Sequence, residues 1–313
     1  MQLIIIVILG AVLGFIYGFN TDGFYFSSNI CFFAGLTLIM PSLFKFELKH
    51  ISLVWKYKKV VFKGLMVNYL LLPIIAMVIG FVTGDFGIAA GLFLLSILSG
   101  GGMVMHWIKH SKGDISFGFL LLFINLLLIS VSLLMLHIFG GLVAPYFEKS
   151  YNNSVGISQF VTLVIVLLIV IPFIASRIVR LSKPILTRIQ TYQKHISQIS
   201  IFIILFYLFG LQNSQTLVDI YDFEPELFFI SFVAVLIFYL IVFWLSKVIY
   251  NLDNAQERAV FWHSITRYLT LALVIATFSV NSFGISMLLP IMFAYIVQIP
   301  LSVYISQKHL SEV

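Results

Sequence analysis

The sequence predicts an all-α polytopic membrane protein, because composition, the length of its apolar runs and the placement of its charges all point to this class. Of its 313 residues, 61% are hydrophobic and only 10% are charged, whereas soluble proteins carry about 25% charged residues. A helix needs about 20 apolar residues to cross the hydrocarbon core. The chain therefore has the length for about ten crossings and no room for a sizeable soluble domain.

Ten apolar runs follow one another along the chain. They lie at residues 2–18, 28–44, 62–83, 86–108, 116–139, 157–179, 198–213, 227–249, 257–280 and 285–306. The first run lacks a basic N-terminal region and contains Gly10 and Gly14, as a closely packed helix would. We expect it to be retained rather than cleaved as a signal peptide.

The basic residues predict the orientation of these spans. Of the 18 Lys and Arg residues, sixteen lie in or beside the even-numbered connections or at the C-terminal end, and only Lys149 lies in an odd-numbered connection. Because cytoplasmic loops are enriched in Lys and Arg, both termini are expected to be cytoplasmic. Orientation thus accounts for the net charge of +6, and we expect no nucleic-acid partner.

The remaining cation, Arg267, falls in the middle of the ninth span, and no Asp or Glu falls at hydrocarbon depth in any span. A charged side chain at this depth costs several kcal/mol of insertion free energy, so its presence suggests a function. Its guanidinium could bind an anionic solute through a carboxylate, sulfate or phosphate-like group. The alternative is a structural arginine that bonds carbonyls of an unwound fourth span.

Two spans carry polar or flexible interruptions near mid-membrane. The fourth contains Ser99-Gly100-Gly101-Gly102, and the ninth contains His263-Ser264-Ile265-Thr266-Arg267. Contiguous glycines cost a helix about 1 kcal/mol each and free its backbone to unwind. We therefore predict broken helices whose ends offer backbone groups to a substrate, the alternative being glycines that only allow close helix packing.

These interruptions occupy the fourth position of each half of the chain. Five spans entered from the cytoplasm, in residues 1–150, precede five entered from outside, in residues 151–313, which is the arrangement of inverted-repeat transporters. The substrate site is predicted at Arg267, Gly100, Gly101, Gly102, Asn68, Thr266 and Thr270.

Two histidines, His106 and His263, flank the interruptions, each beside a tryptophan. Either could exchange a proton near neutral pH, or both could be neutral groups bonded to backbone near the cytoplasmic interface. Two histidines are too few ligands for a metal site, and the lone Cys31 offers no thiolate cluster. No metal or cofactor is expected.

Several segments, in order along the chain, resemble the arsenical-resistance permeases of the bile acid:sodium symporter superfamily. They are Gly35–Leu43, Asn68–Pro73, Gly102–Trp107 with Lys112–Asp114, Asn281-Ser282 and Val297–Pro300. The resemblance implies ten helices in two inverted five-helix repeats, with helices four and nine crossing at their unwound centres. It also implies a core domain of helices 3–5 and 8–10, a panel domain of helices 1, 2, 6 and 7, alternating access, and a plasma (inner) membrane location.

The departures from that family narrow the expected chemistry. By alignment, the arsenite cysteine falls on Gly100 and the glutamate of span nine on Thr270, which puts arsenite export in doubt. The residues that hold sodium in the sodium-coupled branch fall on Val104, Met105, His263 and Arg267. Because a hard cation needs oxygen ligands, we predict sodium-independent transport with Arg267 in place of the ion. Gln298 stands where the family has an acidic residue before a proline, and we interpret this site chiefly as a helix kink at Pro300.

The sequence as a whole favours a secondary active transporter that moves a small anionic solute by alternating access. Arsenite or other metalloid efflux, or sodium-coupled organic anion symport, are the alternatives. An intramembrane enzyme is not expected, because the chain lacks a buried aspartate pair, a His-Glu-x-x-His motif and a Gly-x-Ser-x-Gly motif. The lipid bilayer and a small-molecule substrate are the expected partners, and the oligomeric state stays open.

Overall fold

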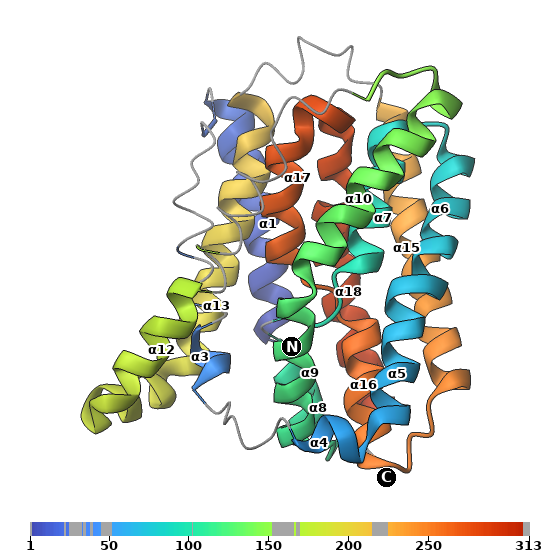
Figure 1. Cartoon of the computed structure of the whole chain (residues 1–313). Coiled ribbons are helices and arrows are strands. Elements are labelled where there is room, and N and C mark those ends of the chain that lie inside the picture. The colour runs from blue at the N-terminus through green and yellow to red at the C-terminus, as the bar shows by residue number, and fades with distance from the viewer. Residues whose placement is uncertain are drawn as a thin grey trace. The chain divides into compact units, whose positions relative to one another are not determined.

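The computed structural model describes residues 2–21, 23–24, 33, 36–37, 40–44, 52–101, 103–151, 166, 170–214 and 225–308. Every named element in these residues is a helix (Figure 1), which agrees with the predicted all-α class. The chain divides into two compact units. Unit 1 comprises Met1–Phe44 and Val166–Phe229, and unit 2 comprises Lys45–Ile165 and Ile230–Val313.

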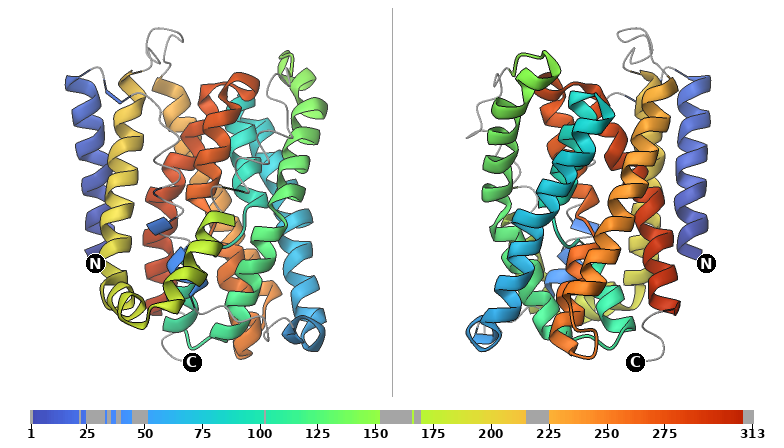
Figure 2. Two further views of the ribbon diagram at one scale, coloured as in Figure 1. Left: turned by 60° about the vertical axis from the view of Figure 1, so that its left-hand side comes forward. Right: turned by 90° about the vertical axis from the view of Figure 1, so that its right-hand side faces the viewer.

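Unit 1 is built on the pair α1 and α13, which lie side by side in Figures 1 and 2. Its helices are α1 (Gln2–Asn20), α3 (Met40–Leu43), α12 (Ile171–Leu181) and α13 (Lys183–Ser214). A Cβ added at Gly14 would overlap the backbone of Phe206, and one at Gly10 would lie 3.1 Å from the carbonyl oxygen of Phe202. The two glycines thus allow the close helix packing that the first span predicted.

Unit 2 contains the remaining helices, apart from the first residues of α15, which belong to unit 1. In chain order they are α4 (Ser52–Lys56), α5 (Lys58–Met66), the π-helical turn η3 (Val67–Leu71), α6 (Leu72–Thr83), α7 (Phe86–Ile97), α8 (Val104–His110), α9 (Ile115–Leu127), α10 (Ile129–Val143), η4 (Ala144–Phe147), α15 (Pro225–Ile249), α16 (Ala255–Ile265), α17 (Leu269–Phe283), η6 (Ile285–Met287) and α18 (Leu288–Lys308).

Among the described residues, four helical segments are long and apolar enough to cross a membrane: Lys58–Thr83, Ile129–Phe147, Glu226–Ile249 and Ile285–Gln307. Shorter apolar helices occupy Ile8–Asn20, Phe86–Ile97, Ile115–Leu127 and His195–Tyr207. The spans predicted at 28–44 and 157–179 lie largely outside the described residues. The chain is therefore a multi-pass membrane protein, and the count of ten helices and the inverted repeat remain predictions.

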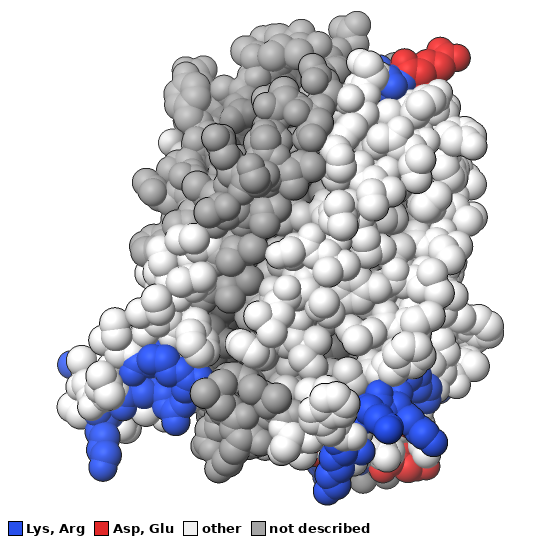
Figure 3. All heavy atoms as spheres, in the orientation of Figure 1, with Lys and Arg blue, Asp and Glu red and all other residues white. Residues whose placement is uncertain are grey.

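The charges of unit 2 fit this membrane assignment. Lys and Arg side chains gather at the end of the unit where α4 and α5 lie, and on the face that Figure 3 shows, the described surface between the two ends of the unit carries no charged side chain. Lys56, Lys58 and Lys59 are exposed at that end, whereas apolar side chains such as Val82 and Leu142 are exposed on the helices above it. An apolar exposed surface of this kind suits contact with lipid.

The core of unit 2 surrounds α7 and α16. Every residue of α7 is buried, and α7 packs against α6, α10, α17 and α18. In α16, every residue from Arg258 to Ile265 is buried. The Asp85 side chain caps the start of α7 by accepting a hydrogen bond from Ile88 N at 2.7 Å. Both buried helices end at the interruptions that the sequence identified.

Candidate functional site

Two broken helices meet inside unit 2. The helix of the fourth span stops at Ile97 and resumes at Val104, and that of the ninth stops at Ile265 and resumes at Leu269. The breaks predicted from the glycine run and from the polar stretch are therefore present. We call the place where they meet the crossover.

The backbone groups of the two breaks form hydrogen bonds with one another. Ser99 and Arg267 form an isolated antiparallel bridge. Gly100 N donates to the carbonyl oxygen of Thr266 at 2.8 Å and to that of His263 at 3.1 Å, while Tyr268 N donates to the carbonyl oxygen of Leu98 at 3.0 Å. Unwound backbone that is buried in a membrane protein must find partners within the protein, and here each break supplies partners to the other.

Gly100 is required at the crossover for two reasons. Its φ of +77° lies in the left-handed region, which residues with a Cβ rarely adopt. An added Cβ would also lie 2.6 Å from Nδ1 of His263. Gly101 is less constrained, since its Cβ would lie 3.3 Å from the carbonyl oxygen of Arg267. The third predicted glycine, Gly102, lies outside the described residues.

Arg267 is buried at the crossover, with 1% of its surface exposed. Its Nη1 donates to Oδ1 of Asn68 at 3.0 Å and to the carbonyl oxygen of Ser96 at 3.1 Å, and its Nη2 donates to the carbonyl oxygen of Ser264. The Nε atom is buried with no hydrogen-bond partner. The guanidinium is thus held by neutral oxygen atoms, and no carboxylate pairs with it in the described part of the chain.

These contacts bear on both interpretations of Arg267. The bond to Ser96, in the last turn of α7, is the kind of carbonyl contact that a structural arginine makes. The missing counter-charge and the unbonded Nε are features that an anion would satisfy. The assignment of Arg267 to substrate binding remains a prediction.

Asn68 reaches the arginine from the π-helical turn η3, a distortion that often accompanies functional sites. Its Nδ2 donates to the carbonyl oxygen of Gly64 at 2.8 Å and to Oγ of Ser264 at 3.2 Å. Oγ of Ser264 is in turn 2.9 Å from the hydroxyl of Tyr250. With its amide nitrogen engaged in this way, Asn68 presents its oxygen to Arg267.

Gln298, on α18, fixes the backbone at Arg267. Its Oε1 accepts hydrogen bonds from Arg267 N at 2.6 Å and from the hydroxyl of Tyr239 at 2.7 Å. Its side chain is 3% exposed. The sequence interpretation gave this position chiefly a kink at Pro300, and it missed both this contact and Tyr239. The sequence feature that could have indicated this contact is the side-chain amide of Gln298, a polar group within an apolar span.

The two candidate proton carriers occupy different environments. His263 is buried, with Nδ1 3.2 Å from Nδ2 of Asn125 and Nε2 3.0 Å from the carbonyl oxygen of Gly118. An amide nitrogen donates and a carbonyl accepts, so these partners fit the neutral ring with its proton on Nε2. His106 is exposed on α8. Its ring meets Trp107 edge-on, with centroids 4.9 Å apart.

The predicted threonines complete the ninth-span break. Thr266 directly follows the last residue of α16, and its Oγ1 donates to the carbonyl oxygen of Trp262 at 2.5 Å. Thr270 lies in the first turn of α17, and its side chain lies outside the described residues. Within the described part of the chain, no group of three or more His, Cys, Asp or Glu could hold a metal ion.

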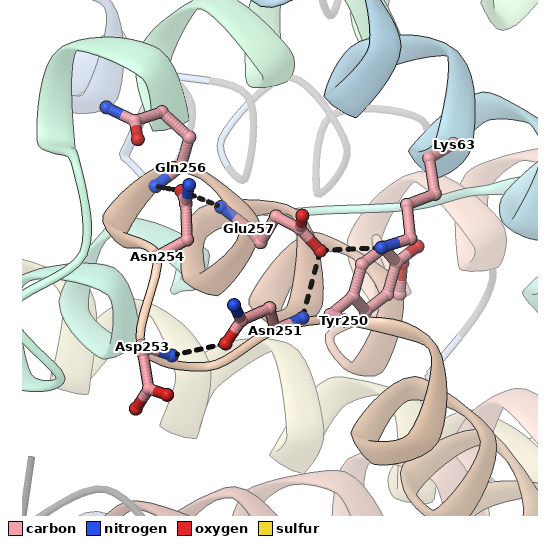
Figure 4. Close-up of polar contacts among 8 residues, drawn as sticks. Lys63, Tyr250, Asn251, Asp253, Asn254, Gln256 and Glu257 are labelled. Carbon is pink, nitrogen blue, oxygen red and sulfur yellow. Dashed lines mark hydrogen bonds and ion pairs between the residues drawn. The ribbon is translucent and has the colours of Figure 1, made fainter.

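A polar cluster at the start of α16 holds that helix in place (Figure 4). The Lys63 ammonium on α5 pairs with Oε2 of Glu257 at 2.6 Å, and the same oxygen accepts a hydrogen bond from Asn251 N at 2.9 Å. Oδ1 of Asn254 accepts from the backbone N–H groups of Gln256 and Glu257 and so caps α16. The cluster thereby fixes the end of the helix that leads to the crossover.

The sequence profile of the Sodium Bile acid symporter family matches residues 33–219, which is more than half of the chain. The chain belongs to the sodium bile acid symporter family. Members of this family are membrane transporters, which agrees with the apolar helices and the buried crossover. The match includes Asn68 and the glycine break but ends before α16, so it does not extend to Arg267 or Gln298. No curated protein matches this chain.

Proposed function

We propose that this symporter-family protein is a secondary transporter that moves a small anionic solute by alternating access and without sodium. The observation that carries the proposal is the buried guanidinium of Arg267, held by neutral oxygen atoms with no carboxylate partner in the described residues.

We infer sodium independence because the Arg267 guanidinium binds the oxygen atoms that a sodium ion would need as ligands. Amide and carbonyl oxygens, such as those of Asn68, Ser96 and Ser264, are the ligands that hard cations use. Here they are engaged by a guanidinium that cannot be deprotonated in proteins and cannot leave. A cation brought beside it would meet repulsion at close range and low dielectric.

The anionic charge of the solute follows from the uncompensated charge. A buried cation without a counter-charge carries a desolvation cost of several kcal/mol. A carboxylate, sulfate or phosphate-like group near the crossover would offset part of this cost and would suit the unbonded Nε of Arg267. Arsenite efflux is less favoured because Gly100 offers no thiolate at the crossover.

We further propose that unit 2 acts as the core domain and unit 1 as the panel domain. We also propose that the protein lies in the plasma membrane with both termini on its cytoplasmic side. The separation of the chain into two compact units supports the first part. The gathering of Lys and Arg at one end of unit 2 supports the second (Figure 3).

The test compares Arg267→Ala with Arg258→Ala in the detergent-purified protein. Arg258 is a matched control, because it is a second buried arginine. It lies on α16, is 7% exposed, and donates through Nη1 to the carbonyl oxygen of Ser111 at 3.1 Å. Thermal stability is measured against a panel of organic and inorganic anions, arsenite and sodium, since a bound ligand raises apparent stability.

We expect at least one anion to stabilise the wild type and Arg258→Ala but not Arg267→Ala, with no effect of sodium on any of them. Arg267→Lys keeps the charge without the planar fork and should bind the same anion more weakly. Stabilisation by sodium or arsenite that persists in Arg267→Ala would contradict the proposal. Uptake of the same anion by proteoliposomes without sodium then tests transport itself.

A further inference from the structure

Tyr250 joins the polar cluster at the start of α16 to the crossover. The residue directly follows α15 and is 3% exposed. Its hydroxyl lies 2.9 Å from Oγ of Ser264 on α16. Its ring lies beneath the ammonium of Lys63, with Nζ 5.4 Å from the ring centroid (Figure 4), and Lys63 in turn pairs with Glu257. The hydroxyl is thus bonded towards the crossover, whereas the ring contacts the ion pair.

From the hydroxyl of Tyr250, hydrogen bonds continue to Arg267. Oγ of Ser264 accepts from Nδ2 of Asn68 at 3.2 Å, and the same Nδ2 donates to the carbonyl oxygen of Gly64 at 2.8 Å. Both hydrogens of the amide nitrogen are then used. At the other end of the amide, Oδ1 accepts from Nη1 of Arg267 at 3.0 Å. The four side chains are between 0% and 4% exposed, so bulk water does not compete for these bonds.

The orientation of the Asn68 amide decides whether Arg267 meets an acceptor or a donor. A guanidinium only donates hydrogen bonds, whereas an amide accepts at its oxygen and donates at its nitrogen. If the amide were flipped, its N–H groups would face the guanidinium and buried donors would be left unpaired, which costs stability. The observed orientation therefore needs two acceptors at the amide nitrogen, and the carbonyl of Gly64 and the hydroxyl of Ser264 provide them.

The Ser264 hydroxyl acts only as an acceptor for Asn68 when its own hydrogen is engaged elsewhere. A serine hydroxyl carries one hydrogen and can turn either to donate or to accept. When Ser264 donates this hydrogen to the oxygen of Tyr250, any bond that it forms with Asn68 is one that it accepts. Without the phenol oxygen, the hydrogen is free to turn towards Asn68 and to stabilise the flipped amide. The hydroxyl of Tyr250 thus acts on the end of Asn68 that faces Arg267.

We propose that Tyr250 is a positioning residue for Arg267, which it holds through Ser264 and Asn68. The Lys63 ammonium fixes the ring of Tyr250, so the ion pair at the start of α16 acts on the crossover through the same phenol. The guanidinium is held in a position that leaves its Nε without a partner among the described residues. That this Nε then receives the solute rests on the proposed function above, whereas the positioning itself does not.

The first measurement needs no solute. The apparent melting temperature of the full-length protein in mild detergent is measured for Tyr250→Phe in the wild type and in an Arg267→Met background, which keeps a long side chain. Loss of the hydroxyl should lower the melting temperature of the wild type by about 2–6 °C. Where Arg267 is absent, the amide has no guanidinium to face, so the same substitution should cost less than about half as much. An Asn68→Leu background should give the same reduction and serves as a second, independent cycle.

A matched control removes a hydroxyl elsewhere in unit 2. The hydroxyl of Tyr151 lies 3.1 Å from Nδ1 of His137, and neither residue belongs to the bonds that lead to Arg267. Tyr151→Phe should therefore lower the melting temperature by the same amount with and without Arg267. A Tyr250 that only packed and bonded locally would behave like Tyr151, so the cycle separates positioning from local structure.

The second measurement follows anion binding, with acetate and sulfate as the probe anions and the concentration at half-maximal thermal stabilisation as the readout. Tyr250→Phe should raise this midpoint by about tenfold or more, because hydrogen bonds to charged groups are worth at least that factor. Lys63→Met keeps the hydroxyl and should raise the midpoint by about two- to fivefold, the strength of a partly exposed cation–π contact. Lys59→Met, which removes an exposed cation of α5, and Tyr151→Phe should leave it unchanged.

Equal losses from Tyr250→Phe with and without Arg267 would overturn the inference, whether or not an anion binds. An anion that stabilises the wild type and Tyr250→Phe with the same midpoint would also overturn it, while the proposed function would stand. An effect of Lys59→Met equal to that of Lys63→Met would refute the link through the ring of Tyr250. If neither probe stabilises the wild type, the proposed function fails for these two anions, and the melting cycles alone decide whether Tyr250 positions Arg267.

Discussion

Replacing Gly100 by alanine tests the geometry of the crossover directly. The substitution forces a Cβ onto a backbone with φ of +77° and places it 2.6 Å from Nδ1 of His263. A left-handed conformation costs a residue with a Cβ about 1–2 kcal/mol, and overpacking a tight core costs about 1–3 kcal/mol more. The expected loss of stability is therefore about 2–5 kcal/mol, on the sum of these two ranges.

The assay is the apparent melting temperature of the purified protein in mild detergent. For a chain of this length, about 1 kcal/mol corresponds to roughly 2 °C, so Gly100→Ala should melt about 4–10 °C below the wild type. Gly141→Ala is the matched control, because Gly141 lies in α10 and a Cβ there would meet nothing within 4 Å. This control should leave the melting temperature unchanged or raise it slightly, since alanine favours a helix over glycine.

A double substitution separates the two costs. In a His263→Ala background the imidazole is gone, so Gly100→Ala should retain only the backbone strain of about 1–2 kcal/mol. If Gly100→Ala melts with the wild type, or falls no further than Gly141→Ala, the reasoning about the crossover is refuted. If Gly100→Ala lowers stability equally in the wild type and in the His263→Ala background, the steric clash with His263 is refuted and only the backbone strain is retained.

Two further substitutions probe contacts that hold the site. Gln298→Leu removes the oxygen that accepts hydrogen bonds from Arg267 N and from the Tyr239 hydroxyl. Two buried donors left unpaired should lower stability by about 2–6 kcal/mol. Melting curves of this variant and of Gln298→Glu, which keeps an acceptor, check this expectation. Lys63→Met should cost only about 1 kcal/mol or less, because Lys63 and Glu257 are 36% and 16% exposed. A double-mutant cycle with Glu257→Gln at low and high salt measures the coupling, and a coupling above about 2 kcal/mol would contradict the estimate.

The sequence predicted the features of the site that depend on local chemistry. A run of glycines frees the backbone wherever it occurs, so the break after Ile97 could be located without a structure. Likewise, a single arginine in an apolar span is unusual by itself, which is why Arg267 could be identified. In the described part of the chain, the predicted spans at 62–83, 227–249 and 285–306 correspond to helices long and apolar enough to cross a membrane, whereas the span predicted at 116–139 overlaps such a helix, Ile129–Phe147, only in its second half.

The partners of these residues could not be read in the same way, because they come from distant elements. Gln298 bonds a residue 31 positions away, and Asn68 bonds one 199 positions away. No periodicity encodes such pairs. The two histidines also illustrate this. His106 and His263 both flank the breaks in sequence, yet the first is exposed and the second is buried between Asn125 and Gly118.

On the proposed function, a resident arginine changes what can drive transport. An ion bound from solution enters and leaves in every cycle and so couples its gradient to the solute, whereas the charge of Arg267 never leaves. No ion gradient can then act through that set of oxygens. The empty site carries one positive charge and the site loaded with a monovalent anion carries none, so the membrane potential acts mainly on the empty carrier. Since about 2.3 kcal/mol per 100 mV acts on one charge that crosses the whole membrane, the electrical potential and the solute gradient together would set the direction of net movement.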